Sequence, residues 1–401
     1  MARTPLLATH IHTYKRHRPE QTLLYQLVKH HYPKFLEQLS RKGKSLPRHV
    51  EQEFEEFLKC GRLEHGFLRV VCDDCKHEKH VAFSCKRRGF CPSCGARRMA
   101  ESAKLLVDDV LGGHPIRQWV LSLPIPLRLL LARYPKHLSK IMQIIHRAIS
   151  TDIIHRSCIH RSGYLKKQAK TGAVTYIQRF GSALNLNIHF HMLFLEGVIT
   201  QTQGQAQFKR VKAPSHSDME RVVNTVSHRI AQYLEKTGLI QRDMDNAYLD
   251  LPIDDEDNLL QLQAASVNYR IAVGKETGKR VFTLQTLPAK DEDNYGHLAQ
   301  IGGFSLHAGV FADSHESEKL ERLCRYIARP AISELRLSLT DSGKVRYELK
   351  TPYRNGTTHV FFSPLDFIGK LAALVPPPRL NLTRFYGVFA HNAKVRAEAC
   401  V

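Results

Sequence analysis

The chain has 401 residues, enough for two or three domains and at least one sizeable core. Its 59 Lys and Arg residues outnumber 38 Asp and Glu residues, and a formal net charge of +21 attracts polyanions, with nucleic acid as the first candidate. Charge alone also fits a merely basic or ribosome-associated protein. Prolines and arginines interrupt the most apolar window, residues 119–134, which excludes a membrane span there. The first residues lack the apolar stretch of a secretory signal, so we expect a soluble, cytoplasmic protein without disulfides.

Residues 1–55 predict a helical segment. Apolar residues recur at helical spacing in TLLYQLVKHHYPKFLEQL, and Pro47 lies near the first turn of a second helical pattern. Residues 56–110 predict a separate module, in which short turns crowded with Cys, His, Gly and basic residues precede the helical pattern ARRMAESAKLLVDDVL.

Strand and helix patterns alternate over residues 111–335. We predict strands at QWVLSLP, AVTYIQRF, LNIHFHMLFLEGV and GFSLHAGVF, and helices at PKHLSKIMQIIHRAIS, at SDMERVVNTVSHRIAQYLEKTG with Ser217 as its cap, and at ESEKLERLCRYIARP. Residues 201–216 and LPIDDEDN predict loops, and VNYRIAVGKETGKRVFTL predicts a hairpin. Residues 336–401 predict a β-meander followed by the amphipathic helix LDFIGKLAALV. This order of elements indicates an α+β fold.

Two C-x2-C pairs, Cys72 with Cys75 and Cys91 with Cys94, are separated by fifteen residues. This spacing is typical of a structural zinc ion held by four thiolates, because each pair offers two thiolates from one tight turn. Free buried cysteines are the alternative. The nearby residues Cys60, Cys85 and His65 suggest a second zinc site, and neighbouring arginines are expected to contact DNA phosphates: Arg87, Arg88, Arg97 and Arg98.

The stretch NIHFHMLFL, residues 187–195, carries two histidines within a strand pattern. Residues i and i+2 of a strand project from the same face, so His189 and His191 present both imidazoles to one side while Phe190 points to the other. Two imidazole nitrogens can hold a divalent ion and leave positions open for phosphate oxygens. Two histidines on a half-exposed strand are the plainer interpretation.

Three blocks of the sequence, spanning about residues 50–390, carry a family resemblance. YIQRFGSALNLNIHFHMLFLEGV resembles the His-hydrophobic-His (HUH) strand of rolling-circle transposases of the insertion-sequence-common-region type, a branch of the insertion-sequence-ninety-one family. SCKRRGFCPSCG resembles the zinc-binding region of that family. LERLCRYIARPAIS, LSLTDSGKVRYELK, GTTHVFF and ALVPPPRLNLTRFYGV resemble its C-terminal half.

The resemblance implies an HUH endonuclease-like antiparallel sheet flanked by helices and a nucleophilic tyrosine on a helix downstream, which is Tyr326 here. On a helical wheel Leu320, Leu323, Cys324 and Ile327 make the buried stripe with Tyr326 at its flank. Arg329 is expected to assist catalysis, and Arg322 and Arg325 to bind DNA. A boundary tyrosine without a catalytic role is the alternative. Some family members carry a second tyrosine four residues earlier, where this chain has Arg322, so one nucleophile must act twice or a second protomer must contribute.

A third ligand is expected, because two imidazoles hold Mg²⁺ or Mn²⁺ poorly. His307 is the first choice, with Gln300 and Glu196 as alternatives, and a hydrogen-bonded core histidine is the plainer interpretation of His307.

The resemblance thus implies a transposase that nicks and rejoins single-stranded DNA at element ends through a 5′-phosphotyrosine, with structural zinc, catalytic Mg²⁺ or Mn²⁺, DNA as partner and a homodimer as one arrangement. A plasmid replication initiator or relaxase shares this chemistry. A zinc-dependent DNA-binding regulator without catalysis is a different class. No phosphate-binding G-x-x-x-x-G-K-[ST] loop is present, and no membrane partner is expected.

Overall fold

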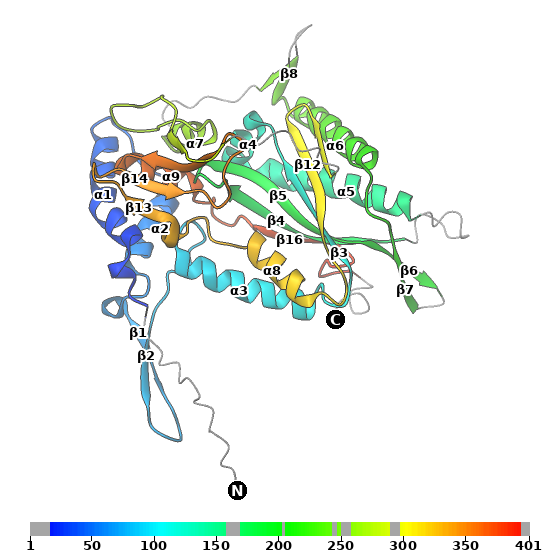
Figure 1. Cartoon of the computed structure of the whole chain (residues 1–401), viewed down its shortest axis with the longest axis horizontal. Coiled ribbons are helices and arrows are strands. Elements are labelled where there is room, and N and C mark those ends of the chain that lie inside the picture. Colours follow the sequence, from blue (N-terminus) through cyan, green and yellow to red (C-terminus); the bar gives the residue numbers. More distant parts are fainter. Residues whose placement is uncertain are drawn as a thin grey trace.

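The computed structural model describes residues 17–157, 169–202, 205–242, 247–249, 258–288 and 297–393. The predicted acidic loop LPIDDEDN lies outside these residues except for its last asparagine, as do the outer ends of both terminal segments. Helices and antiparallel strands build the described part of the chain, which confirms the predicted α+β class (Figure 1).

The largest sheet in the described residues has six strands in the order β11-β12-β3-β5-β4-β16, and every neighbouring pair is antiparallel. These strands are β3 (Ile116–Ser122), β4 (Gly172–Phe180), β5 (Leu186–Leu195), β11 (Leu298–Ile301), β12 (Phe304–Ala312) and β16 (Thr383–Gly387). Nearly all of β5 is buried, because β3 and β4 flank it and side chains cover both of its faces.

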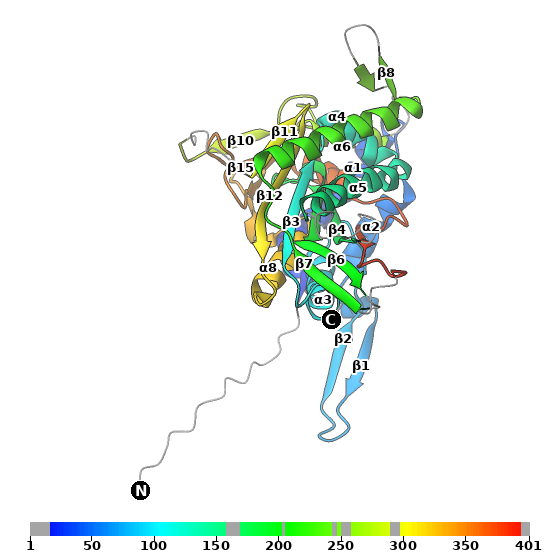
Figure 2. The same cartoon turned by 90° about the vertical axis from the view of Figure 1, so that its right-hand side faces the viewer.

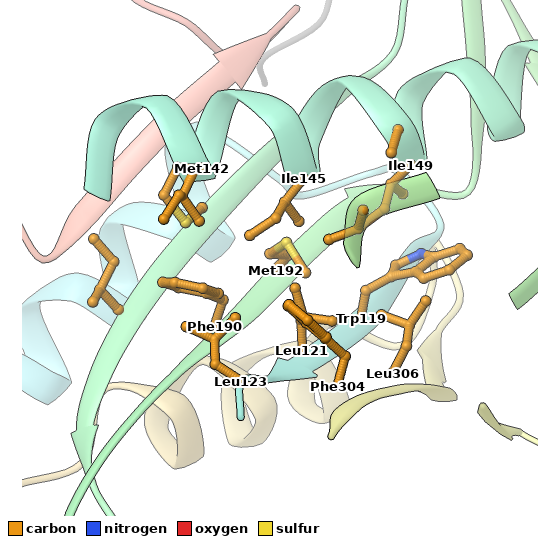
Figure 3. Packing of buried hydrophobic residues seen from close by; sticks show 14 of the residues in the cluster. Trp119, Leu121, Leu123, Met142, Ile145, Ile149, Phe190, Met192, Phe304 and Leu306 are labelled. Carbon is orange, nitrogen blue, oxygen red and sulfur yellow. The ribbon is translucent and has the colours of Figure 1, made fainter. Parts of the chain in front are cut away.

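One face of this central sheet is apolar and packs against two long helices, α5 (Leu138–Arg156) and α6 (His216–Lys236) (Figure 2). Figure 3 shows Trp119, Phe190 and Met192 of the sheet beneath Met142 and Ile145 of α5. Burying each such side chain contributes about 1.5–3 kcal/mol. This face therefore anchors β5, and the alternation of the strand turns its histidines to the opposite face.

The opposite face is covered in part by α3 (Pro92–Asp109) and α8 (Ser317–Ile327), which contact each other beneath the sheet (Figure 1). Leu106 of α3 and Leu323 of α8 belong to one buried cluster with Val174 and Leu193 of the sheet. This packing brings α8 onto the face that carries the two histidines of β5.

A second core joins the two ends of the described chain. Its helices are α1 (Leu23–Ser40), α2 (Arg48–Lys59), α7 (Asn258–Val267) and α9 (Pro364–Leu374), and its strands are β10 (Phe282–Gln285), β13 (Leu337–Leu339), β14 (Val345–Glu348) and β15 (Thr357–Phe362). Phe35 and Phe54 of the N-terminal helices share this core with Tyr347 and Phe367. N-terminal and C-terminal segments therefore pack as one layer.

The sheets do not follow the predicted division of the chain at residue 336. β16, from the C-terminal segment, pairs with β4 of the central sheet, whereas β10, from the middle segment, pairs with β15. A strand at the edge of a sheet presents unpaired backbone groups to a further strand. The strands that pair with β4 and β15 at these edges come from distant parts of the sequence.

Several local predictions also need correction. Residues 201–216 are not all loop, since β6 (Gly197–Thr202) and β7 (Gln205–Arg210) form a hairpin. Ser215 caps α6 in place of Ser217, because a capping box forms between Ser215 and Asp218. In the predicted hairpin VNYRIAVGKETGKRVFTL, β10 forms, but the rest is turns with a single Arg270–Arg280 bridge, and α7 was not predicted.

The smaller elements are β1 (Phe67–Val71), β2 (Glu78–Ala82), α4 (Ile125–Arg133), β8 (Ile240–Arg242) and β9 (Ala247–Leu249). β1 and β2 form an antiparallel hairpin that projects away from the body (Figure 1). None of the helices in the described ranges is long and apolar enough to span a bilayer.

Candidate functional site

The two imidazoles of β5 meet at their Nε2 atoms. His189 and His191 project from the same face of β5, and their Nε2 atoms lie 3.1 Å apart. With metal–nitrogen bonds of about 2.1 Å, nitrogens at this separation subtend an angle of about 95° at one shared ion, close to an octahedral angle. The pair therefore fits two adjacent ligand positions around a single divalent ion.

Hydrogen bonds orient both rings. The backbone carbonyl of Asn187 accepts from His189 Nδ1 at 2.9 Å, which places the proton on Nδ1 and leaves Nε2 with a free lone pair. Gln118 Nε2 lies 2.7 Å from His191 Nδ1 and donates to it, which leaves the proton of the neutral ring on Nε2. For His191 Nε2 to bind an ion, the proton must move to Nδ1 and the Gln118 amide must turn so that its oxygen accepts from Nδ1.

Burial keeps these imidazoles uncharged. Desolvation lowers the pKa of His189 to about 4, with Arg329 and Arg128 adding repulsion. Desolvation also lowers the pKa of His191 well below its usual range, and His189 and Arg329 add to the effect. Both groups are neutral at pH 7, the state in which imidazole binds metals.

A glutamine of the neighbouring strand completes the cluster. Gln178 lies opposite His189 in the β4–β5 ladder, and its Oε1 is 3.3 Å from His191 Nε2. Its Nε2 donates to the carbonyl of Ile327 at 3.3 Å, which fixes the amide with its oxygen toward the histidines. Two nitrogens and one carbonyl oxygen therefore converge from two strands, a ligand set that suits a divalent ion with open positions.

The structure does not bring the predicted third ligand into this cluster. His307 pairs with Val120, which pairs with His191, so two strand spacings of about 4.8 Å each separate the two histidines. Glu196, at the far end of β5, accepts a hydrogen bond from Arg117 at 2.6 Å. Gln300 lies on β11, beyond His307. Gln178, and none of these three residues, has a side-chain atom at 3.3 Å from His191 Nε2, and the identity of a third ligand stays a prediction.

Tyr326 reaches the histidine pair from α8. Its ring centroid lies 6.2 Å from that of His191, at an interplanar angle of 87°, and 40% of the residue is exposed. The predicted stripe of Leu320, Leu323, Cys324 and Ile327 is buried. The phenol thus stands at the border between the core and solvent, with its ring edge-on to a buried imidazole.

Two cations lie over the tyrosine ring. The Arg329 guanidinium lies 4.3 Å from the ring centroid, and Lys350 Nζ lies 4.1 Å from it. Desolvation lowers the pKa of both groups, and for Lys350 the charges of Arg329 and Arg336 add to this effect. Arg322 and Arg325 lie on the exposed side of α8, where Arg325 pairs with Glu321 at 2.7 Å. Arg329, rather than the other two arginines, therefore borders the site.

Four cysteines form a separate cluster beside α3. The Sγ atoms of Cys60, Cys85, Cys91 and Cys94 lie within 4.8 Å of one another, with pairs at 3.4, 3.7 and 3.8 Å. Tetrahedral zinc with bonds of about 2.3 Å needs sulfur atoms about 3.8 Å apart. The four thiolates therefore fit one structural zinc ion.

This cluster corrects the predicted ligand set. Cys91 and Cys94 are shared with the prediction, but Cys72 and Cys75 lie exposed in the turn between β1 and β2, at the tip of the hairpin. The base of the hairpin instead brings Cys60 and Cys85 close together, because Gly61 N donates to Phe83 O there at 2.9 Å. His65 is not part of the cluster in the described residues.

Two family models match the chain. A model described as "Putative transposase" matches residues 172–396, more than half of the chain, and includes β4, β5 and α8. The chain belongs to this transposase family. A model of the transposase zinc-binding domain of insertion-sequence-91 (IS91) elements matches residues 27–123, which contain the four clustered cysteines of the transposase. No curated protein and no solved structure matches.

These matches establish an IS91-type transposase with an N-terminal zinc region. DNA is accordingly the partner on which the transposase family acts. The sequence interpretation missed Gln178, Gln118 and Lys350. Gln178 carries a weak signal in hindsight, because it alternates with Tyr176 along the strand pattern YIQRF.

Proposed function

We propose that the transposase cuts and rejoins single-stranded DNA at the ends of its element through a covalent bond to Tyr326. The observation that carries this proposal is the position of the Tyr326 ring, edge-on to His191 and in contact with two cations, Arg329 and Lys350. The nuclease is of the HUH type, and a nucleophile beside two neutral imidazoles is the arrangement that such chemistry requires.

His189, His191 and Gln178 would hold Mg²⁺ or Mn²⁺. When bound, the ion polarises the scissile phosphate and stabilises negative charge on its non-bridging oxygens. His191 and His189 need lose no proton at pH 7 to act as ligands, because burial holds their pKa values low.

The phenol oxygen of Tyr326 attacks the phosphorus in line. A phosphorus–oxygen bond to tyrosine forms, the bond to the 3′ oxygen breaks, and the phenolic proton leaves to solvent while the departing oxygen becomes a 3′-hydroxyl. Rejoining is the reverse: a 3′-hydroxyl attacks the phosphotyrosine and releases Tyr326. Arg329 and Lys350 place positive charge where the phosphate oxygens approach.

Arg322 occupies the position four residues before Tyr326, so this helix supplies one nucleophile. Each strand transfer would then use Tyr326 again, or a second protomer of a homodimer would provide its own tyrosine. The transposase and zinc-region matches favour transposition over nicking at a plasmid origin. Such activity places the protein at DNA in the bacterial cytoplasm, in association with the nucleoid.

The test uses labelled single-stranded oligonucleotides carrying element ends, incubated with the zinc-loaded protein and Mn²⁺. We expect a protein–DNA adduct that survives denaturing electrophoresis, and none with Tyr326→Phe. Tyr248→Phe is the matched control, because Tyr248 is similarly exposed, at 51%, on the distant β9. Tight DNA binding without any adduct would instead identify a non-catalytic DNA-binding regulator.

A further inference from the structure

A cavity of about 110 Å³ lies beside the candidate site, where four parts of the chain meet. Its walls come from residues 87–102 of the zinc region, residues 176–180 of β4, residues 327–331 at the end of α8 and residues 374–383. The pairing of β16 with β4 stops at Thr383 and Tyr176, and the last contact is from Ile177 N to Leu382 O. The final residues of β4 therefore have a free edge, and the cavity lies beside it.

Five arginines line this cavity: Arg87, Arg88, Arg98, Arg179 and Arg329. No carboxylate is among the lining residues, and within the described ranges none of the five arginines has a carboxylate oxygen within 4.0 Å. The buried carboxylate of Glu53, outside the lining, accepts from Gly89 N at 2.7 Å and attracts Arg87 and Arg98 over a longer distance. The cavity, called the arginine pocket below, therefore carries a strong positive charge.

Arg179 is the most unusual member of the pocket. It is 4% exposed, its Nε donates only a long bond of 3.4 Å to Leu374 O, and its buried NH2 group has no hydrogen-bond partner in the described structure. Desolvation lowers its pKa to about 10, so it stays charged at pH 7. A buried, unpaired cation is costly, which makes an anion the natural complement of the pocket.

The pocket adjoins the tyrosine through Arg329. Arg329 lies over the Tyr326 ring on one side and 5.5 Å from the Phe180 ring on the other, and both Arg329 and Phe180 line the pocket. Gly95 of α3 permits the close packing of the zinc region against Pro330, since a β-carbon at residue 95 would approach Pro330 to 2.6 Å. A strand bound across the histidines and Tyr326 would thus reach the arginines with its next backbone groups.

We propose that the arginine pocket binds a backbone phosphate of the DNA strand, next to the phosphate that Tyr326 attacks. Guanidinium groups match phosphate oxygens in bidentate geometry, and apolar walls such as Ile177, Pro330 and Leu382 exclude water from the contact. The inference rests on the proposed function for the path of the strand. If the pocket binds a phosphate in this way, the zinc region forms part of the wall beside the nuclease site, in addition to any DNA contacts that it makes elsewhere.

The test measures binding of a fluorescent single-stranded oligonucleotide by Tyr326→Phe protein across a range of salt concentrations. Arg179→Met is expected to weaken binding at least ~10-fold, equivalent to about 1.4 kcal/mol. It should also flatten the slope of log K against log salt by about 0.7, the value for one lost phosphate contact on a single strand. Arg41→Met removes an exposed, remote charge paired with Glu37 and should change neither quantity.

Thermal unfolding distinguishes a phosphate-binding role of Arg179 from a purely structural one. Removing an unpaired buried cation should leave the melting temperature of Arg179→Met at or above that of its parent, whereas an arginine with only a structural role would lower it. Arg98→Met, which alters a less buried wall residue, provides a second variant with the same expected loss of affinity and slope. Unchanged affinity and slope in both variants would overturn the proposal.

Two further arms identify the source of the phosphate. If inorganic phosphate raises the melting temperature but both variants bind DNA normally, the pocket serves a free anion and the proposal fails. If Arg179→Met loses DNA binding and wild-type protein forms no covalent adduct, the results would support the pocket and refute the phosphotyrosine step. The two proposals therefore fail separately.

Discussion

Replacing Gln178 by alanine tests the ligand set most sharply. The substitution removes the oxygen that lies 3.3 Å from His191 Nε2 and the hydrogen bond to Ile327 O. Loss of a ligand or of a group that orients one typically weakens metal affinity 10–100-fold, which is about 1.4–2.7 kcal/mol. The lost hydrogen bond adds a destabilisation of about 1 kcal/mol, too little to unfold the protein.

Calorimetric titration of zinc-loaded protein with Mn²⁺ measures the effect. Gln178→Ala should shift the Mn²⁺ dissociation constant by the stated factor, with a melting temperature near that of wild type. His307→Ala and Gln300→Ala are matched controls, because the sequence pointed to these residues and the structure places them on β12 and β11. If His307→Ala weakened Mn²⁺ binding and Gln178→Ala did not, the proposed ligand set would be wrong.

Three other outcomes are expected. Cys91→Ser should release the zinc ion and destabilise the protein, whereas the Cys72→Ser/Cys75→Ser double variant should retain one zinc per chain by atomic absorption; equal zinc loss in both would contradict the cluster. His146 packs between Phe194 and Tyr386, and burial lowers its pKa to about 4, so its contribution to stability is lost as pH falls from about 6.5 toward 4, by about 3 kcal/mol. Urea unfolding of His146→Phe should show a shallower decline over this range, and an unaltered decline would refute the assignment. Lys350→Met should slow single-turnover adduct formation about 10-fold, because it removes a cation over the Tyr326 ring; an unchanged rate would exclude that role.

Local periodicity was enough to predict the histidine strand and the tyrosine helix. His189 and His191 share a face because alternation is a property of any strand, and Tyr326 flanks the buried stripe because helical spacing places it there. Both predictions depend on residues close together in the sequence. The face toward which each points is set by the same local pattern.

Local periodicity could not predict contacts between segments that are distant in the sequence. Gln178 joins the histidines through the register of β4 against β5, and Lys350 reaches Tyr326 from beyond β14. The spacing of two C-x2-C pairs favoured the wrong thiolates, because the β1–β2 hairpin carries Cys72 and Cys75 away and closes its base around Cys60 and Cys85. Strand pairing, which depends on the whole chain, decided each of these outcomes.

The central claim is most directly tested by locating the covalent bond. Wild-type protein is incubated with an element-end oligonucleotide and Mn²⁺, digested with protease and nuclease, and analysed by mass spectrometry. The proposed mechanism predicts a nucleotide joined through its 5′-phosphate to the peptide that contains Tyr326. Attachment to any other residue would contradict it, as would complete cleavage of the DNA with no peptide–nucleotide bond.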